Sequence, residues 1–366
     1  KGLFAVVHNG IVENYLPIKE ELIAKGYEFK SETDTEVVAH LLADLYDGDF
    51  EGTVRRMLDR IEGSYSLVIT CADDPSRIIC TKQDNPLVIG LGKGENFIAS
   101  DIPAIINRTR DTYILNDGEV AIVTADSVAI SDRAGHPIEK EIYHVTWNAE
   151  AAEKGGYEHF MLKEIYEQPK AIRDTLTGRI SKDNTEVVYE ELNWTPDDVA
   201  SINRVLITAC GTAYHAGLVA KYYIEQLARI PVEVDIASEY RYRNPLTDKN
   251  TLAIVISQSG ETSDTLAALK EAKRLGARTL AITNVVGSAI ARESDYVVYI
   301  WAGPEISVAS TKAYTTMLIA EYLLGVYLAQ QKGMDNAALR SEILDSLVQL
   351  PAIAEAMLSD EYLANI

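Results

Sequence analysis

Residues 252–262, Leu-Ala-Ile-Val-Ile-Ser-Gln-Ser-Gly-Glu-Thr, decide the fold of the C-terminal part of this chain. Their first five residues form an apolar run, which is typical of a strand that is buried on both faces. Hydroxyl-bearing residues and one glycine follow, and the periodic segment 263–275 then predicts a helix. A buried strand that runs through a short loop into a helix is the repeating unit of a parallel sheet covered by helices.

The same unit recurs on both sides of this stretch. The expected strands are 205–209, 232–236, 252–256, 279–282 and 296–300, and the expected helices are 214–228, 263–275 and 311–330. Apolar strands that alternate with helices predict a doubly wound parallel sheet with both faces covered.

The N-terminal part has a different rhythm, in which short strands occur in groups apart from amphipathic helices. The expected strands are 4–7, 66–70, 78–81, 87–91, 97–99 and 120–123, and the expected helices are 15–25, 35–46 and one near 52–60. This grouping is typical of a layered α+β domain. The overall class is therefore α/β, with an α+β sandwich followed by a doubly wound parallel-sheet domain.

Composition changes suggest four segments along the chain. We expect an N-terminal domain over 1–148, a linker and helix over 149–195, the parallel-sheet domain over 196–333 and linker helices over 334–366. Small and polar residues from 149 to 156 are typical of a linker. Pro169 is expected to break or kink a helix over 158–177. The helical tail after Met334 shows no capping or packing partner in the sequence itself.

Charge and composition exclude several classes of function. The 366 residues carry 34 Lys+Arg against 55 Asp+Glu, a net charge of -21, which would repel nucleic acid and anionic membrane. Cys71, Cys80 and Cys210 form neither a disulfide framework nor a zinc spacing. The most apolar stretch, 317–329, is interrupted by Glu321 and is too short to cross a bilayer, and we expect no signal peptide. We expect a soluble cytoplasmic protein.

Three loops of the second domain are rich in hydroxyl groups, namely 210–213, 257–262 and 308–312. Hydroxyls and backbone N–H groups at a helix N-terminus favour an anion, and such loops converge at one edge of a parallel sheet. A phosphorylated small molecule is the expected ligand, although N-capping by Ser or Thr would explain any one loop alone. Lys312 is expected to be a solvated lysine in a first helical turn, and not a catalytic group.

These loops resemble the sugar-binding loops of a sugar isomerase (SIS) domain. More narrowly, they resemble the first SIS domain of the glucosamine-6-phosphate synthase family, the glutamine–fructose-6-phosphate aminotransferases. The family often has Ser after the Cys-Gly-Thr turn, where this chain has Ala213, so one sugar-hydroxyl contact is put in question. The resemblance implies sugar-phosphate contacts at Thr212, Ser257, Gln258, Ser259, Thr262, Val308 and Ser310.

A second group of candidates lies near the N-terminus, where Asn9 and Gly10 follow the first expected strand. An Asn-Gly pair is most often a tight turn between strands. The functional interpretation is an oxyanion hole made of the Asn9 side-chain amide and the Gly10 N–H, and a packing role is expected for His8 beside them. Further along, Thr33 and Glu36 predict a capping box in front of an apolar helix.

Asn9, Gly10 and Asp34, in this order, resemble the N-terminal-nucleophile (Ntn) glutaminase domain of class II glutamine amidotransferases. The resemblance implies that Asn9 and Gly10 form the oxyanion hole and that Asp34 holds the α-amino group of L-glutamine. Residues 163–169 resemble the join between the glutaminase and isomerase halves. Amidophosphoribosyltransferase has a related glutaminase domain, but the SIS loops exclude it.

The resemblance covers essentially the whole chain and implies an enzyme of hexosamine synthesis. It would convert D-fructose 6-phosphate and L-glutamine to D-glucosamine 6-phosphate and L-glutamate, as a homodimer with no metal or organic cofactor. The family's N-terminal cysteine nucleophile is not at Lys1, and its second SIS domain would begin near Ile366. We therefore expect an inactive fragment of a longer enzyme. A sugar-phosphate sensor and a deglycase-type relative are the alternatives.

Overall fold

The computed structural model describes residues 2–102, 104–145, 154–334 and 336–359. It divides into two compact units, Lys1–Ala149 and Glu150–Ile366. Of the linker expected at 149–156, residues 149–153 lie outside the described residues. None of the helices in the described ranges is long and apolar enough to cross a membrane.

The N-terminal unit contains two antiparallel sheets. The first has the order β1-β2-β3-β7-β8, with β1 (Phe4–Val12), β2 (Gly63–Cys71), β3 (Asp74–Gln83), β7 (Val120–Val123) and β8 (Val128–Ser131). The second has the order β5-β4-β6-β9, with β4 (Val88–Leu91), β5 (Asn96–Ala99), β6 (Asp111–Ile114) and β9 (Tyr143–His144).

Alternating side chains divide the core of this unit into two layers. Leu67 and Ile69 of β2 face three helices, α1 (Tyr15–Ala24), α2 (Asp34–Leu45) and α3 (Phe50–Leu58). On the other face, Cys80 and Ala121 pack towards Ile89 of the second sheet. Helices on one sheet and a second sheet behind it make the layered α+β sandwich that the sequence predicts.

The first strand is longer than the sequence predicts. β1 does not end at Val7 but stays paired with β2 as far as Val12, which lies opposite Gly63. Asn9 and Gly10 therefore lie inside the strand, and the interpretation of this pair as a turn is wrong. The backbone stays extended through Gly10 because it adopts a φ of 133°, which glycine accepts at little cost.

The C-terminal unit is built on one parallel sheet with the order β11-β10-β12-β13-β14. Its strands are β10 (Arg204–Ala209), β11 (Val232–Ile236), β12 (Thr251–Ser257), β13 (Arg278–Thr283) and β14 (Tyr296–Tyr299). All four pairings are parallel. The strand order reverses between β10 and β12, which confirms the doubly wound class.

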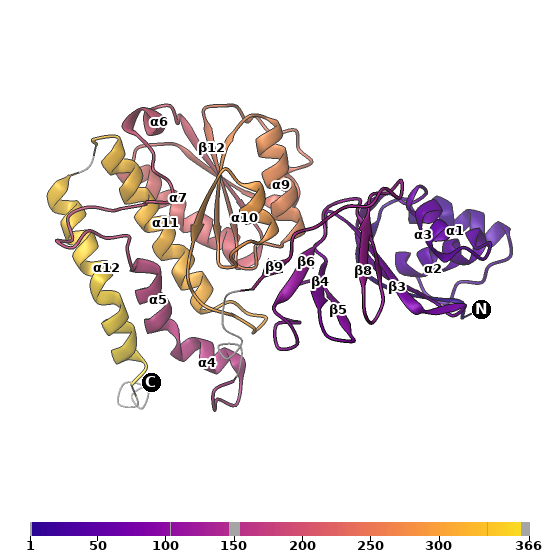
Figure 1. Cartoon of the computed structure of the whole chain (residues 1–366). Helices are drawn as coiled ribbons and strands as arrows, with labels where there is room; N and C mark the ends of the chain where they lie inside the picture. The colour runs from indigo at the N-terminus through magenta and orange to yellow at the C-terminus, as the bar shows by residue number, and fades with distance from the viewer. Residues whose placement is uncertain (1, 103, 146–153, 335, 360–366) are drawn as a thin grey trace. The chain divides into compact units, whose positions relative to one another are not determined.

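Helices cover both faces of this sheet, as Figure 1 shows. Ile207 and Ile254 belong to the core against α5 (Gln168–Leu176), α6 (Pro196–Ala200), α7 (Gly211–Leu227) and α11 (Lys312–Gln331). On the opposite face, Leu206, Ala253 and Val255 pack towards α8 (Ala237–Tyr240), α9 (Ser263–Arg274) and α10 (Ala289–Glu293). The apolar strands are thus buried on both sides, as their composition predicts.

Two expectations about the flanking helices need correction. The helix expected over 158–177 is two helices, α4 (Phe160–Tyr166) and α5, and Pro169 lies in the first turn of α5, where its missing N–H costs nothing. The tail is not without partners: α12 (Ala337–Met357) is N-capped by the Asn336 side chain, which accepts hydrogen bonds from two backbone N–H groups. Leu344 and Leu347 of α12 are buried in the core of the unit.

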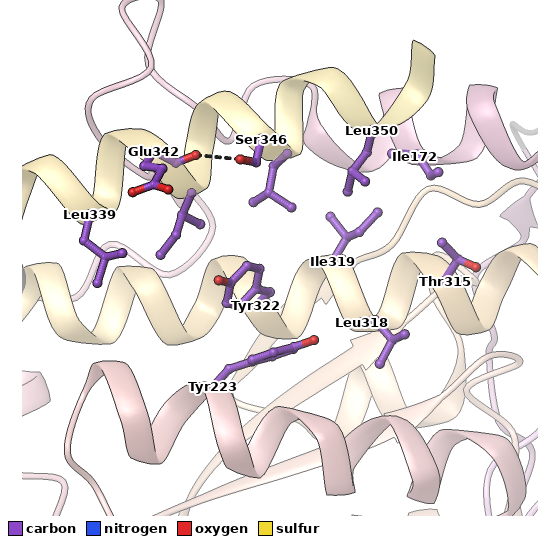
Figure 2. Close-up of a pocket in the computed structure, with 12 residues that line it drawn as sticks. Ile172, Tyr223, Thr315, Leu318, Ile319, Tyr322, Leu339, Glu342, Ser346 and Leu350 are labelled. Carbon is purple, nitrogen blue, oxygen red and sulfur yellow. Dashed lines mark hydrogen bonds between the residues drawn. The ribbon is translucent and has the colours of Figure 1, made fainter. Parts of the chain in front are cut away.

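An apolar groove of about 460 Å³ remains between α7, α11 and α12 (Figure 2). Tyr223 of α7 and Tyr322 of α11 lie along it, with their ring centroids 4.2 Å apart. On α12 the Ser346 hydroxyl donates to the backbone oxygen of Glu342, 2.8 Å away, one helical turn earlier.

One acidic side chain of α11, Glu321, is buried without a hydrogen-bond partner among the described residues. Glu321 is 1% exposed. Burial raises the pKa of the Glu321 carboxyl well above its ordinary value, because the ionised form loses its hydration. The same burial keeps a group inside the core that would be more stable in water.

We predict that Glu321→Leu stabilises the C-terminal unit by about 1–3 kcal/mol at pH 8. As pH rises above the ordinary pKa of a glutamic acid, the unfolded state releases the Glu321 proton while the folded state retains it. The free energy of unfolding therefore falls with rising pH. The gain should therefore be smaller at pH 5 than at pH 8 in urea unfolding. Glu355→Leu, on the exposed side of α12, is the control; an equal gain at both pH values would contradict this account.

Candidate functional site

A cavity of about 190 Å³ lies at the carboxyl ends of β10 and β12. These strands are neighbours, but α7 after β10 and α9 after β12 lie on opposite faces of the sheet. The divergence leaves a crevice at this edge, which is where open parallel sheets bind ligands. Lining residues come from three loops and α11: Cys210, Thr212, Ala213, Ile256, Ser257, Gln258, Ser259, Thr262, Glu305, Ser307, Val308, Ser310 and Met317.

All seven residues that the SIS resemblance points to lie around this one cavity. They are Thr212, Ser257, Gln258, Ser259, Thr262, Val308 and Ser310. Their roles in binding remain a prediction, whereas their proximity is a property of the fold. Sequence reasoning missed Glu305 and Ser307, which lie just before the third loop. The acidic residue ahead of a Ser-Thr pair at a helix start was the signal that could have found them.

Hydrogen bonds within the 257–262 loop hold its hydroxyl groups in place. The Ser257 hydroxyl lies 2.9 Å from that of Thr262 and accepts a bond from the Gly260 N–H at 3.0 Å. The Glu261 N–H donates to the Ser259 hydroxyl at 3.1 Å. The loop leads into α9, whose N-terminus carries the positive end of the helix dipole. An anion at this point would meet hydroxyls and N–H groups together.

Gly260 lets this loop lie directly on its neighbours. Its φ is 67°, and a Cβ atom there would lie 2.0 Å from the Ser288 hydroxyl and 2.8 Å from that of Thr283. The Glu261 carboxylate accepts a bond from the Ala289 N–H at 2.9 Å, which ties the loop to the start of α10. The rear of the loop is therefore supported by β13 and α10.

The third loop is organised by Glu305. Its carboxylate accepts bonds from the Ser310 hydroxyl at 2.9 Å, the Thr311 N–H at 2.8 Å and the Ala313 N–H at 3.2 Å. The acid thus satisfies the first N–H groups of α11, an arrangement that the helix dipole favours. Because this N-terminus is already occupied by a carboxylate, the start of α9 is the stronger candidate for a ligand anion.

The hydrogen-bond donors that line the cavity are neutral, and Glu305 is the acidic residue among the lining residues. None of the lining residues in the described part of the chain is basic. Lys312 is not solvated, contrary to the expectation from sequence: its side chain is 2% exposed and its Nζ lies 2.6 Å from a carboxylate oxygen of Glu167. Burial raises the pKa of the Cys210 thiol, so this lining residue is a neutral thiol at pH 7.

In the N-terminal unit, Gly10 lies where two strands approach most closely. A Cβ atom there would lie 2.1 Å from the Ser64 carbonyl oxygen and 2.4 Å from the Asn85 side-chain nitrogen. That nitrogen donates to the Asn9 carbonyl oxygen at 2.8 Å. No residue with a side chain fits at position 10 without moving β2, which explains the Asn-Gly sequence inside a strand.

Asp34 lies next to the same strand. Its carboxylate accepts a bond from the Val12 N–H at 2.7 Å, and the neighbouring Thr35 hydroxyl lies 3.0 Å from the His8 ring nitrogen. The start of α2 is therefore joined to β1 on both sides of Asn9 and Gly10. The structure brings the three predicted residues of the glutaminase site into one region of the unit.

The expected capping box at the start of α2 is wrong. The Thr33 side chain makes no capping bond, and Glu36 instead accepts bonds from the backbone N–H groups of Lys30 and Ser31 and from the Ser31 hydroxyl. These bonds lower the pKa of Glu36 to about 2. The acid thus holds the preceding loop, since that loop turns back over the first turn of α2.

His8 has the packing role that the sequence suggests. Its side chain is 2% exposed, and its second ring nitrogen has no partner among the described residues. Burial lowers the pKa of His8, and the Asp34 carboxylate 3.8 Å away opposes that shift. The His8 ring is therefore neutral at pH 7. Its bond to Thr35 links β1 to α2.

Comparison with known proteins agrees with this division into units. Residues 198–327 match the SIS domain family, and residues 1–107 match a glutamine amidotransferase domain family. The glutamine--fructose-6-phosphate aminotransferase of Clostridium tetani is 54% identical over 367 residues, which cover 100% of this chain and 60% of that protein. The one from Caldanaerobacter subterraneus is 58% identical over 98% of this chain and 59% of its own length.

A solved structure gives the same result for the fold. The C-terminal domain of glucosamine-fructose-6-phosphate aminotransferase from Francisella tularensis is 39% identical, with a TM-score of 0.51 over 55% of each chain. The present chain spans about 60% of the length of the curated relatives it matches.

We predict that Gly260→Ala destabilises the C-terminal unit by about 2 kcal/mol or more, because a methyl group meets Ser288 in addition to the cost of the left-handed backbone. Gly276→Ala is the matched control, since its φ of 89° is also left-handed but nothing lies within 4 Å of the added atom. The control should lose only about 1 kcal/mol. Equal losses in urea unfolding would show that the contact with Ser288 is unimportant.

Proposed function

Because this chain belongs to the family of glutamine–fructose-6-phosphate aminotransferases, we propose that its protein makes D-glucosamine 6-phosphate and L-glutamate from D-fructose 6-phosphate and L-glutamine. The observation that carries the proposal is the presence of both required modules in one chain. A glutamine amidotransferase domain would release the nitrogen, and an SIS domain would bind the sugar phosphate that accepts it. The product feeds the synthesis of UDP-N-acetylglucosamine.

In the SIS domain we assign the phosphate group to the 257–262 loop. Ser257, Ser259 and Thr262 supply hydroxyl donors, Gln258 supplies an amide, and the N-terminus of α9 adds its dipole. Such neutral donors suit a chain with a net charge of -21, because they recognise an anion locally without a cluster of lysines. The phosphate would thus be held by directional hydrogen bonds and not by bulk charge.

The sugar itself would contact the other two loops. Thr212 at the start of α7 and Ser310 before α11 offer hydroxyl groups, and Val308, which also lines the cavity, has a fully exposed side chain. Ala213 has no hydroxyl group to add, so the sugar loses a possible partner on the α7 side. We infer that the second and third loops select the sugar and that the 257–262 loop binds its phosphate.

In the amidotransferase domain we assign Asn9 and Gly10 to the oxyanion hole and Asp34 to the α-ammonium group of L-glutamine. Hydrolysis of the amide passes through a tetrahedral oxyanion, and each donor aimed at it lowers the barrier by about 3 kcal/mol. The close packing of Gly10 against Ser64 supports a rigid donor, since the backbone there has little room to move. The bond from Val12 to Asp34 similarly orients the carboxylate.

We further infer a homodimer that acts in the cytoplasm. Large apolar side chains remain exposed on the C-terminal unit, among them Tyr242 at 70% and Leu246 at 87%. Such side chains are available for contact with a second copy of the chain. The reaction needs neither a metal nor an organic cofactor, because glutamine supplies the amine and the sugar supplies the carbonyl group.

For the sugar-phosphate site we predict that the chain binds D-fructose 6-phosphate and that Ser257→Ala weakens binding about tenfold, the effect of one lost hydrogen bond to a charged group. D-Fructose without its phosphate should bind far more weakly. Isothermal titration calorimetry measures both. Ser201→Ala removes an exposed hydroxyl group that does not line the cavity and should leave the affinity unchanged. Equal binding of the phosphorylated and unphosphorylated sugars would contradict the assignment.

For the glutamine site we predict that Asp34→Asn in the whole enzyme raises KM for L-glutamine at least about tenfold, because a charged pair is lost. The asparagine oxygen can still accept the Val12 N–H, so the start of α2 stays in place. Synthesis with ammonia as the nitrogen donor should be unchanged. Asp44→Asn on the same helix, where the carboxylate pairs with Lys25, is the control. A normal KM would exclude Asp34 from the site.

A further inference from the structure

A helix outside the parallel sheet bonds to the two residues just before the third loop of the cavity. Glu164 of α4 is 1% exposed, and its carboxylate accepts bonds from the Ile306 N–H at 2.6 Å and the Ser307 N–H at 3.1 Å. Its second oxygen accepts the Ser307 hydroxyl. These partners lie 142 and 143 residues further along the chain, so the contact is purely tertiary.

The next turn of the chain makes a second contact with the same region. Glu167, at the C-cap of α4, pairs with the buried Lys312 at the start of α11. Glu164 thus holds the loop at residues 306–307, and Glu167 holds the helix that follows it. The segment between these two points contains Val308 and Ser310, which both line the cavity.

The bonds from Glu164 and Glu167 determine the path of the segment before α11. Residues 300–311 between β14 and α11 have no helix or strand of their own, so tertiary bonds set their path. A buried carboxylate is stable only when donors surround it, which restricts the loop to conformations that present both N–H groups and the hydroxyl to Glu164. Ser307 is itself a lining residue, so a bond to Ser307 directly sets one point of the cavity wall.

We propose that Glu164 is a positioning residue for sugar-phosphate binding, which holds the 306–310 wall of the cavity without touching the ligand. This inference rests on the sugar-phosphate site proposed above. It adds a residue of α4, a helix that contributes nothing to the lining, to the determinants of that site. The cavity then depends on α4 as well as on the three loops and α11 that line it.

The test is Glu164→Gln, with the affinity for D-fructose 6-phosphate measured by calorimetry and the mobility of the loop measured by hydrogen–deuterium exchange. The amide keeps one acceptor oxygen but turns an NH2 group towards a donor, so we expect about tenfold weaker binding and faster exchange over 306–310. Glu164→Asp keeps the charge and should recover part of the affinity. If Glu164→Gln does not fold, the affinity and exchange of Glu164→Asp test the proposal instead.

A variant of the core separates positioning from stability. Leu347→Ala removes a buried side chain of α12 from the same unit and should lower Tm without changing the affinity for the sugar phosphate. If Glu164→Gln lowers Tm in the same way but binds normally, Glu164 is only structural and the proposal is wrong. If the wild-type chain binds no D-fructose 6-phosphate, the proposed function of the cavity fails, and the positioning role fails with it.

Discussion

The parallel pairing of β10 with β12 is the interaction on which the candidate site depends. Its register sets Ala209 opposite Ile256, so the chain leaves both strands at the same level of the sheet. Because α7 and α9 then pack on opposite faces, Thr212 and Ser257 face a common crevice that no helix fills. A shift of this register would separate the two loops, although each would keep its own hydrogen bonds.

Acidic side chains organise this crevice from outside, in a chain that is strongly acidic as a whole. Glu261 fixes the 257–262 loop to α10, Glu305 caps α11, and Glu164 bonds to Ile306 and Ser307. Each carboxylate accepts backbone N–H groups that would otherwise lack partners. Lys312, a basic side chain close to the third loop, is paired with Glu167. The donors left around the cavity are therefore uncharged.

In the N-terminal unit, close backbone packing and one acidic side chain likewise hold the candidate site residues. The β1–β2 ladder brings the chain so close at Gly10 that only a hydrogen atom fits, and Asn85 bonds to the adjacent carbonyl group. Asp34 is joined to the same strand by the Val12 N–H. In the proposed glutamine site, packing thus restricts the backbone at Gly10, and the Val12 N–H orients the Asp34 carboxylate; a fixed donor is what stabilisation of an oxyanion requires.

The sequence by itself determined the features that depend on neighbouring residues. Apolar runs such as 252–256, the helical periods after them and the hydroxyl-rich loops identify the doubly wound sheet and its ligand edge. Tertiary structure alone decided where distant partners intervene. β1 continues through Asn9 because β2 pairs with it, and Lys312 is buried because Glu167 lies beside it. Glu36 leaves its capping position because the 30–31 loop turns back to it. Local spacing records which residues can form an element, but it does not record which residue from another part of the chain will meet that element in space.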